Sequence, residues 1–237
     1  MLRLLTIELH KLRYNKSAKV ISIVYFILIT FIALISSIEF NFGAINFRIA
    51  DQGIFNFPYI WHFNSYIAAI LKLFLAIVIV SMTANEYSNK TLKQNLIDGL
   101  SKKEFILSKF ITVVLFSLVS TLFVFGVSLI LGLIFSDYNE PGIIFSDIAY
   151  LFAYFVKLIG FFSFCLFLGI LVKRSAFALG FLLIWSISEG IIYSIFKWKI
   201  FKDTDIAESM IQFFPLTAMS NLIKEPFSRL GAVQTAA

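Results

Sequence analysis

Residues 110–135 read FITVVLFSLVSTLFVFGVSLILGLIF, a run of 26 residues without a charged side chain. A helix needs about 20 predominantly apolar residues to cross the hydrocarbon core of a bilayer, so this stretch favours a membrane span. Four other windows have the same character: Val20–Ile38, Tyr66–Ala84, Ile148–Val172 and Ala176–Phe196. The sequence therefore predicts an all-α, polytopic helical membrane protein that forms a single transmembrane domain over residues 1–237, with five clear spans.

The composition of the chain argues against a soluble enzyme. Apolar residues make up 59% of the 237 residues and charged residues 14%, against roughly 45–50% and about 25% in soluble domains. The five windows hold only three charged residues, Lys72, Lys157 and Glu189. Cys165 is the one cysteine, so the sequence offers neither a disulfide framework nor a sulfur-based metal site.

Basic residues lie mainly on one side of the predicted spans, which indicates the orientation of the chain. Twelve lysines and arginines precede the first span or lie between spans two and three or four and five, whereas the opposite loops hold only Arg48. The N-terminus is therefore expected in the cytoplasm. Five further basic residues in the tail, 197–237, fall on the outer side, where four acidic residues nearly balance them.

Residues 1–17 are expected to form an amphipathic helix in the cytoplasmic interface. Leucines recur at helical spacing, at positions Leu2, Leu5, Leu9 and Leu12. A basic amphipathic helix next to a span typically places its apolar stripe in the acyl boundary. It could also form part of a platform for a cytoplasmic partner.

Residues 85–109, between spans two and three, carry the clearest local signals. A short helix is predicted whose apolar face consists of Leu92, Leu96, Ile97 and Leu100. Gly99 is expected to end this helix because glycine tolerates positive φ. Ser101 and Glu104 have the spacing of a capping box, which begins a second helix that continues into residues 110–135. Such a segment can transmit the movement of a soluble partner to the membrane, although a solvated charged loop is the alternative.

The order of these motifs resembles that of the permease subunits of the type-2 ATP-binding-cassette exporter family. The residues that carry the resemblance are Glu8, Lys11 and Arg13 near the N-terminus, Glu86, Lys90-Thr91, Ser101-Lys102 and Lys109 in the coupling region, Lys173-Arg174-Ser175, and Phe214–Asn221 in the tail. The resemblance implies a six-span fold in which residues 85–109 dock onto a separate ATPase subunit. The expected coupling residues are Glu86, Lys90, Thr91, Leu92, Leu96, Ile97, Leu100 and Lys102.

The chain departs from this family in having five spans. Residues 206–223 are apolar, but Glu208 and Pro215 make them a poor sixth span. Residues 197–237 are therefore expected to form a re-entrant or surface segment at the outer face, in a chain that ends before the last span.

Lys72, Lys157 and Glu189 are functional-site candidates because ionisable residues within spans are costly. All three are expected in the outer half of the bilayer, which predicts that Glu189 pairs with Lys157 or Lys72. The pair could be structural, with Lys72 snorkelling to the interface. It could instead line a cavity that receives the headgroup of an amphipathic substrate.

The chain has no phosphate-binding loop of the form G-x-x-x-x-G-K-[ST], so a separate ATPase must power any transport. We expect a permease subunit that exports a hydrophobic or amphipathic molecule, paired with itself or a homologue and surrounded by lipid in a bacterial cytoplasmic membrane. No catalytic motif, metal site, cofactor or nucleic-acid partner is indicated. Two alternatives stay open: a scaffold or immunity subunit bound to the same ATPase, and a membrane-embedded enzyme.

Overall fold

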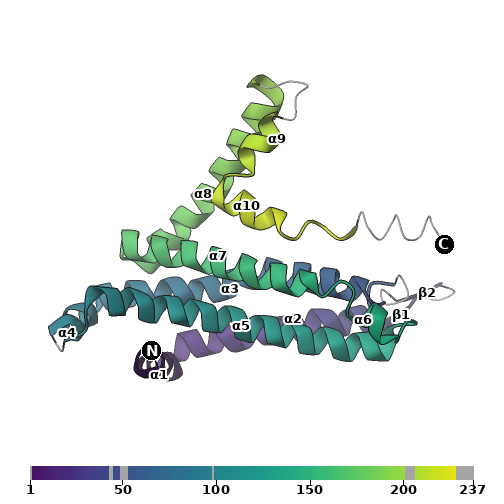
Figure 1. The fold of residues 1–237 in the computed structure, drawn as a ribbon, viewed down its shortest axis with the longest axis horizontal. Coiled ribbons are helices and arrows are strands. Elements are labelled where there is room, and N and C mark those ends of the chain that lie inside the picture. The colour runs from purple at the N-terminus through teal and green to yellow at the C-terminus, as the bar shows by residue number, and fades with distance from the viewer. Residues whose placement is uncertain (1, 43–44, 49–52, 98, 201–205, 228–237) are drawn as a thin grey trace. The chain divides into compact units, whose positions relative to one another are not determined.

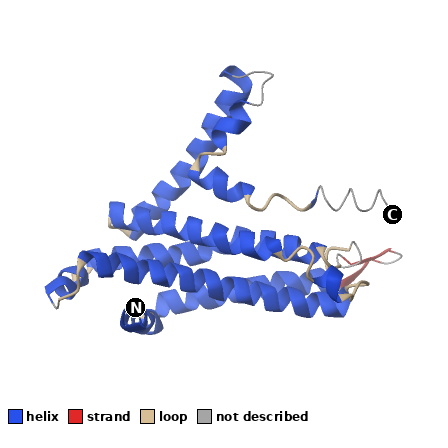
Figure 2. Cartoon of the chain, viewed as in Figure 1, coloured by secondary structure: helices blue, strands red, loops and turns tan. Residues whose placement is uncertain are grey.

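The computed structural model describes residues 2–42, 45–48, 53–97, 99–200 and 206–227, and most of these are helical (Figure 1). The long helices are α2 (Lys16–Ser37), α3 (Tyr59–Ser88), α5 (Lys102–Phe135), α7 (Ala149–Val172) and α8 (Ser175–Ile195). The short ones are α1 (Leu2–Tyr14), α4 (Thr91–Ile97), α6 (Pro141–Ile144), α9 (Ile206–Ile211) and α10 (Pro215–Asn221), with a π-helical turn at Phe196–Ile200. A small antiparallel hairpin joins β1 (Glu39–Phe42) to β2 (Ile45–Arg48) (Figure 2).

The helices confirm the predicted all-α membrane fold. In the described part of the chain, four are long and apolar enough to cross a bilayer: Tyr59–Ser88, Lys102–Phe135, Pro141–Val172 and Ser175–Ile200. A fifth candidate is the pair formed by α1 and α2, which meet at an angle of 88°. Each of the five apolar windows lies inside one of the long helices or extends at most one residue beyond it. The windows could be predicted because the ability of a segment to cross lipid depends on its own length and composition.

The chain divides into two compact units, each built from three segments. The first unit comprises Met1–Ser22, Leu73–Phe116 and Lys157–Leu222, and the second comprises Ile23–Lys72, Ser117–Val156 and Ile223–Ala237.

In the second unit, three buried hydroxyl groups connect three helices. The hydroxyl of Tyr154 on α7 lies 2.7 Å from that of Tyr25 on α2 and 2.8 Å from that of Ser120 on α5. Tyr25 and Ser120 also hydrogen-bond each other, which closes a triangle. Each hydroxyl can donate one bond and accept another, so the triangle satisfies three polar groups that would otherwise be costly in an apolar bundle.

Gly132 in the second unit is required by close packing. A Cβ atom added at this position on α5 meets the Phe57 ring at 2.3 Å, and Phe57 is itself buried. We expect Gly132→Ala to destabilise the protein by about 1–3 kcal/mol, because a filled core resists an added methyl group. The measurement is the melting temperature of the detergent-solubilised protein.

The control for this prediction is Gly126→Ala on the same helix, where an added Cβ meets nothing within 4 Å. This change should leave the melting temperature unchanged or raise it slightly, because alanine is the better helix former. Equal melting temperatures for the two variants would contradict the packing argument.

In the first unit, the local signals of residues 85–109 are confirmed. Gly99 has a φ of +95° and follows the short helix α4. The Glu104 carboxylate accepts hydrogen bonds from the backbone N–H and the hydroxyl of Ser101, at 2.9 and 2.8 Å. The Glu104 N–H donates to the Ser101 hydroxyl at 3.2 Å, which completes the capping box at the start of α5.

The tail residues that the sequence analysis rejected as a span form two short helices, α9 and α10, and not one continuous helix. Pro215 begins α10, at the position where its missing N–H costs least. α9 and α10 both lie against α8 (Figure 1).

Candidate functional site

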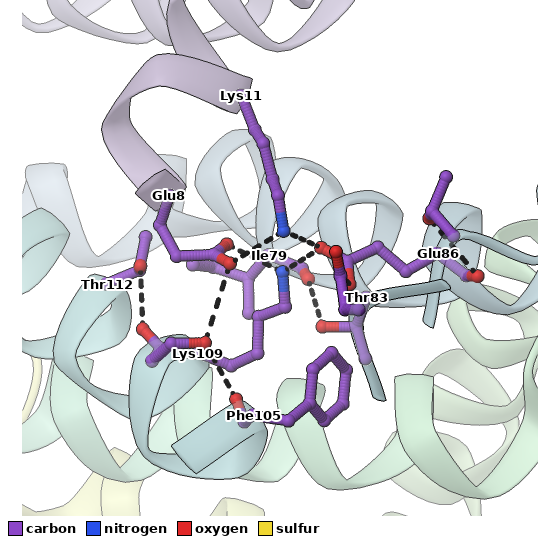
Figure 3. A network of polar contacts seen from close by, with 11 residues as sticks. Glu8, Lys11, Ile79, Thr83, Glu86, Phe105, Lys109 and Thr112 are labelled. Carbon is purple, nitrogen blue, oxygen red and sulfur yellow. Dashed lines mark hydrogen bonds and ion pairs between the residues drawn. The ribbon is translucent and has the colours of Figure 1, made fainter. Parts of the chain in front are cut away.

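Four charged residues of the first unit meet in one place, which we call the charge cluster: Glu8, Lys11, Glu86 and Lys109 (Figure 3). Lys109 Nζ lies 2.6 Å from one oxygen of Glu8 and also contacts Glu86. Lys11 Nζ lies 2.9 Å from Glu86 and 3.2 Å from Glu8. Each ammonium group therefore contacts both carboxylates, and the four formal charges cancel.

Lys109 lies at the centre of the charge cluster and is fully buried, with 0% of its side chain exposed. A buried ammonium is costly unless charged groups surround it, and here two carboxylates do so. The aromatic ring of Phe105 adds a cation–π contact, with Lys109 Nζ 5.4 Å from the ring centroid. The Ser108 hydroxyl also lies near Glu8, at 3.4 Å.

Lys11 lies at the edge of the charge cluster, with 37% of its side chain exposed. Partial burial works to lower the pKa of Lys11, but the hydrogen bond to Glu86 and the charge of Glu8 outweigh it and raise the pKa above its ordinary value. Lys11 therefore stays protonated at neutral pH and keeps both of its ion pairs.

The charge cluster joins helices that are far apart in the sequence. Glu8 and Lys11 come from α1, Glu86 from the end of α3, and Lys109 from the start of α5. The amide of Asn95 on α4 approaches the second oxygen of Glu86 at 3.4 Å, and the Thr91 hydroxyl approaches the Glu86 carbonyl oxygen at 3.4 Å. Glu86 thus connects α4 with α1 and α5.

A cavity of about 120 Å³ adjoins the charge cluster. Most of its lining residues are polar and include, besides the cluster itself, Asn15, Asn85, Asn89 and Thr91. A polar cavity of this size can hold several water molecules.

The predicted apolar face of α4 is only partly covered by the chain itself. None of the seven residues of α4, all of which the structure describes, is buried. Leu92, Leu96 and Leu100 are half-buried, whereas Ile97 is 78% exposed. Of the other predicted coupling residues, Lys90 and Lys102 are exposed, and Lys90 links α3 to α4 with a left-handed φ of 58°.

The ion pair between Glu8 and Lys109 does not follow from the sequence patterns. Lys109 was counted among the basic residues that set the orientation, yet the structure buries it. On α1, the buried positions are Leu4 and Glu8, while Leu9 of the predicted leucine stripe is exposed. The available signal was that Glu8 lies one turn after Leu4, because residues at this spacing share a helix face.

Two of the three intramembrane charges, Lys157 and Glu189, are buried in the first unit, and Lys72 is half-buried in the second. The pairing of Glu189 with Lys157 or Lys72 stays a prediction, and the hydrogen bonds described at its carboxylate come from neutral donors. Its carboxylate accepts hydrogen bonds from the indole N–H of Trp185, from the backbone N–H groups of Leu216 and Thr217, and from the Thr217 hydroxyl. Backbone N–H groups at a helix start carry partial positive charge, which is why they can replace a lysine.

Comparison with known proteins gives one positive finding. A family model described as "ABC-2 family transporter protein" matches residues 4–197, a range that contains the whole charge cluster and α4. No curated protein and no solved structure matches the chain.

Proposed function

Because the chain belongs to the ABC-2 transporter family, we propose that it is the permease subunit of an ATP-driven exporter and that α4 docks onto the separate ATPase. Family membership and the apolar helices make it a multi-pass membrane component of an ABC transport system. Export as the direction of transport and α4 as the contact are the parts that we propose.

The observation that carries the proposal is that α4, whose apolar face is only partly covered, is connected to the buried charge cluster. α4 presents Ile97 to solvent beside the half-buried Leu92 and Leu96, and a partly uncovered apolar face is typical of a contact surface. Through Asn95 and Glu86 the same helix is connected to α1 and α5. A displacement of α4 would therefore be transmitted to α5, a 34-residue helix that is a candidate membrane span.

We further propose that the permease pairs with a second copy or a homologue in a bacterial cytoplasmic membrane. The span window of α8 is only 17% buried within the chain, against 56% for that of α3. Apolar surface of this extent must face lipid or another protein. Contact of this surface with lipid and contact with a second subunit are both consistent with a dimeric permease surrounded by lipid.

The test is site-specific photo-crosslinking in membranes. The permease is produced together with the ATPase encoded beside it, and a photo-reactive amino acid replaces Ile97. We expect the ATPase to be captured at position 97. The control is the same replacement at Tyr138, which is also exposed but which the sequence predicts on the opposite side of the membrane.

Two results would count against the proposal in different ways. A complex that co-purifies without capture at position 97 would show that the ATPase docks elsewhere. Absence of any complex would contradict the proposed pairing with this ATPase and would favour a membrane protein that works without it. An export assay distinguishes a permease from a scaffold that binds the same ATPase. Only a permease produces ATP-dependent loss of substrate from cells.

A further inference from the structure

The start of helix α10 lacks a capping side chain of its own. Phe214 occupies the N-cap position and has no group that can accept a hydrogen bond, and Pro215 has no N–H to donate. The next two N–H groups, of Leu216 and Thr217, donate to the two oxygens of Glu189 at 3.1 and 2.8 Å. The Thr217 hydroxyl donates to the same carboxylate at 2.9 Å. Glu189 of α8 therefore caps α10 from outside.

The remaining donors at this helix start already have partners. The N–H of Ala218 donates to the Phe214 carbonyl at 2.7 Å, and the N–H of Phe214 donates to the Ile211 carbonyl at 2.9 Å. The indole N–H of Trp185 holds the Glu189 carboxylate from its own helix, at 2.7 Å. Glu189 thus supplies the acceptors that the first turn lacks, and its negative charge meets the positive end of the helix dipole.

A charge of the opposite sign meets the other end of α10. The ammonium group of Lys157 on α7 donates to the carbonyl oxygen of Ser220 at 3.4 Å. Ser220 lies in the last turn of α10, where carbonyl groups carry partial negative charge, and its carbonyl oxygen also accepts the backbone N–H of the C-cap residue Leu222. Lys157 and Glu189 are both buried.

Apolar burial is incomplete along α10, where Pro215, Leu216 and Met219 are half-buried and Ala218 is exposed. None of its seven residues, which the structure describes in full, is buried. Met219 lies near α7, because a Cβ atom built at Gly160 would be 3.5 Å from it. The helix is therefore in contact with α7 and α8 but depends on polar contacts at its two ends.

We propose that Glu189 and Lys157 form a charge clamp that seats α10 by the opposite ends of its dipole. The clamp gives a role to two ionisable residues that lie within apolar helices. Because α10 is held by end contacts and not by a buried face, it can be released as a unit when one contact is lost. The clamp is a conformational device that does not depend on the identity of the ATPase or of the substrate.

The test measures how often α10 is packed against α7, with Met219 next to Gly160. Gly160→Cys and Met219→Cys are combined with Cys165→Ala in the full chain, and disulfide formation is followed in native membranes. We expect efficient cross-linking with the clamp intact and a several-fold loss with either Glu189→Ala or Lys157→Met. The matched control is Glu208→Ala, which removes an exposed carboxylate from neighbouring α9 and should cross-link like the parent.

Unchanged cross-linking in both clamp variants would overturn the proposal. Elution in size-exclusion chromatography reports whether each variant is folded. Should Glu189→Ala fail to fold, Glu189→Gln takes its place, since it keeps one acceptor oxygen and should give an intermediate loss. If Glu189→Gln also fails to fold, the carboxylate supports the whole unit and not the seat of α10, which likewise overturns the clamp.

Discussion

Lys109→Met is expected to lower the free energy of unfolding by about 3–5 kcal/mol, the cost typical of breaking a buried ion pair. Methionine preserves most of the apolar stem but removes the charge. Glu8 and Glu86 then share only Lys11, which is partly exposed. Two buried carboxylates without their central cation repel each other, and each loses the hydrogen bond from Lys109. The measurement is the melting temperature of the detergent-solubilised protein.

The control for Lys109→Met is Lys103→Met, which changes an exposed lysine in the same helix. Exposed substitutions of this kind stay within about 0.5 kcal/mol. A further check is the double variant with Glu8→Gln. Because its two changes remove both members of one pair, its loss of stability should be smaller than the sum of the two single losses. Strict additivity would show that Glu8 and Lys109 do not stabilise each other.

Replacing Leu92 and Leu96 together by aspartate is expected to abolish co-purification of the ATPase, which corresponds to an affinity reduced at least about 100-fold. Both side chains lie on the predicted docking face and are half-buried already within the chain. Docking would complete their burial, and a carboxylate cannot be buried without a partner except at high cost. The experiment compares the amount of ATPase retained by wild-type and variant permease after detergent extraction.

Gln94→Asp is the control for the two leucine changes, because it also adds a negative charge to α4 but outside the apolar face. Retention of the ATPase by Gln94→Asp together with its loss in the double variant would locate the contact on that face. Equal retention by all three proteins would contradict docking through α4. The melting temperature should change little, since none of the described residues of α4 belongs to a buried core.

Much of the fold could be predicted because its causes are local. Residues 110–135 form part of a helix that can span a membrane for a reason contained in their own composition, and the other four windows follow the same logic. Gly99 and the Ser101–Glu104 capping box were also predicted, since a cap is decided within a few residues. The apolar face of α4 followed from helical spacing alone.

The charge cluster and the seat of α10 could not be predicted in this way. Lys109 and Glu8 lie 101 positions apart, and Glu189 and Thr217 lie 28 positions apart. Whether an ionised side chain is buried depends on which partners the packed helices bring to it, and no spacing rule specifies them. The sequence by itself therefore determined which segments enter the membrane and where helices start and stop. Only the tertiary structure decided which charges are buried and what they hold, because those partners meet through packing and not through proximity along the chain.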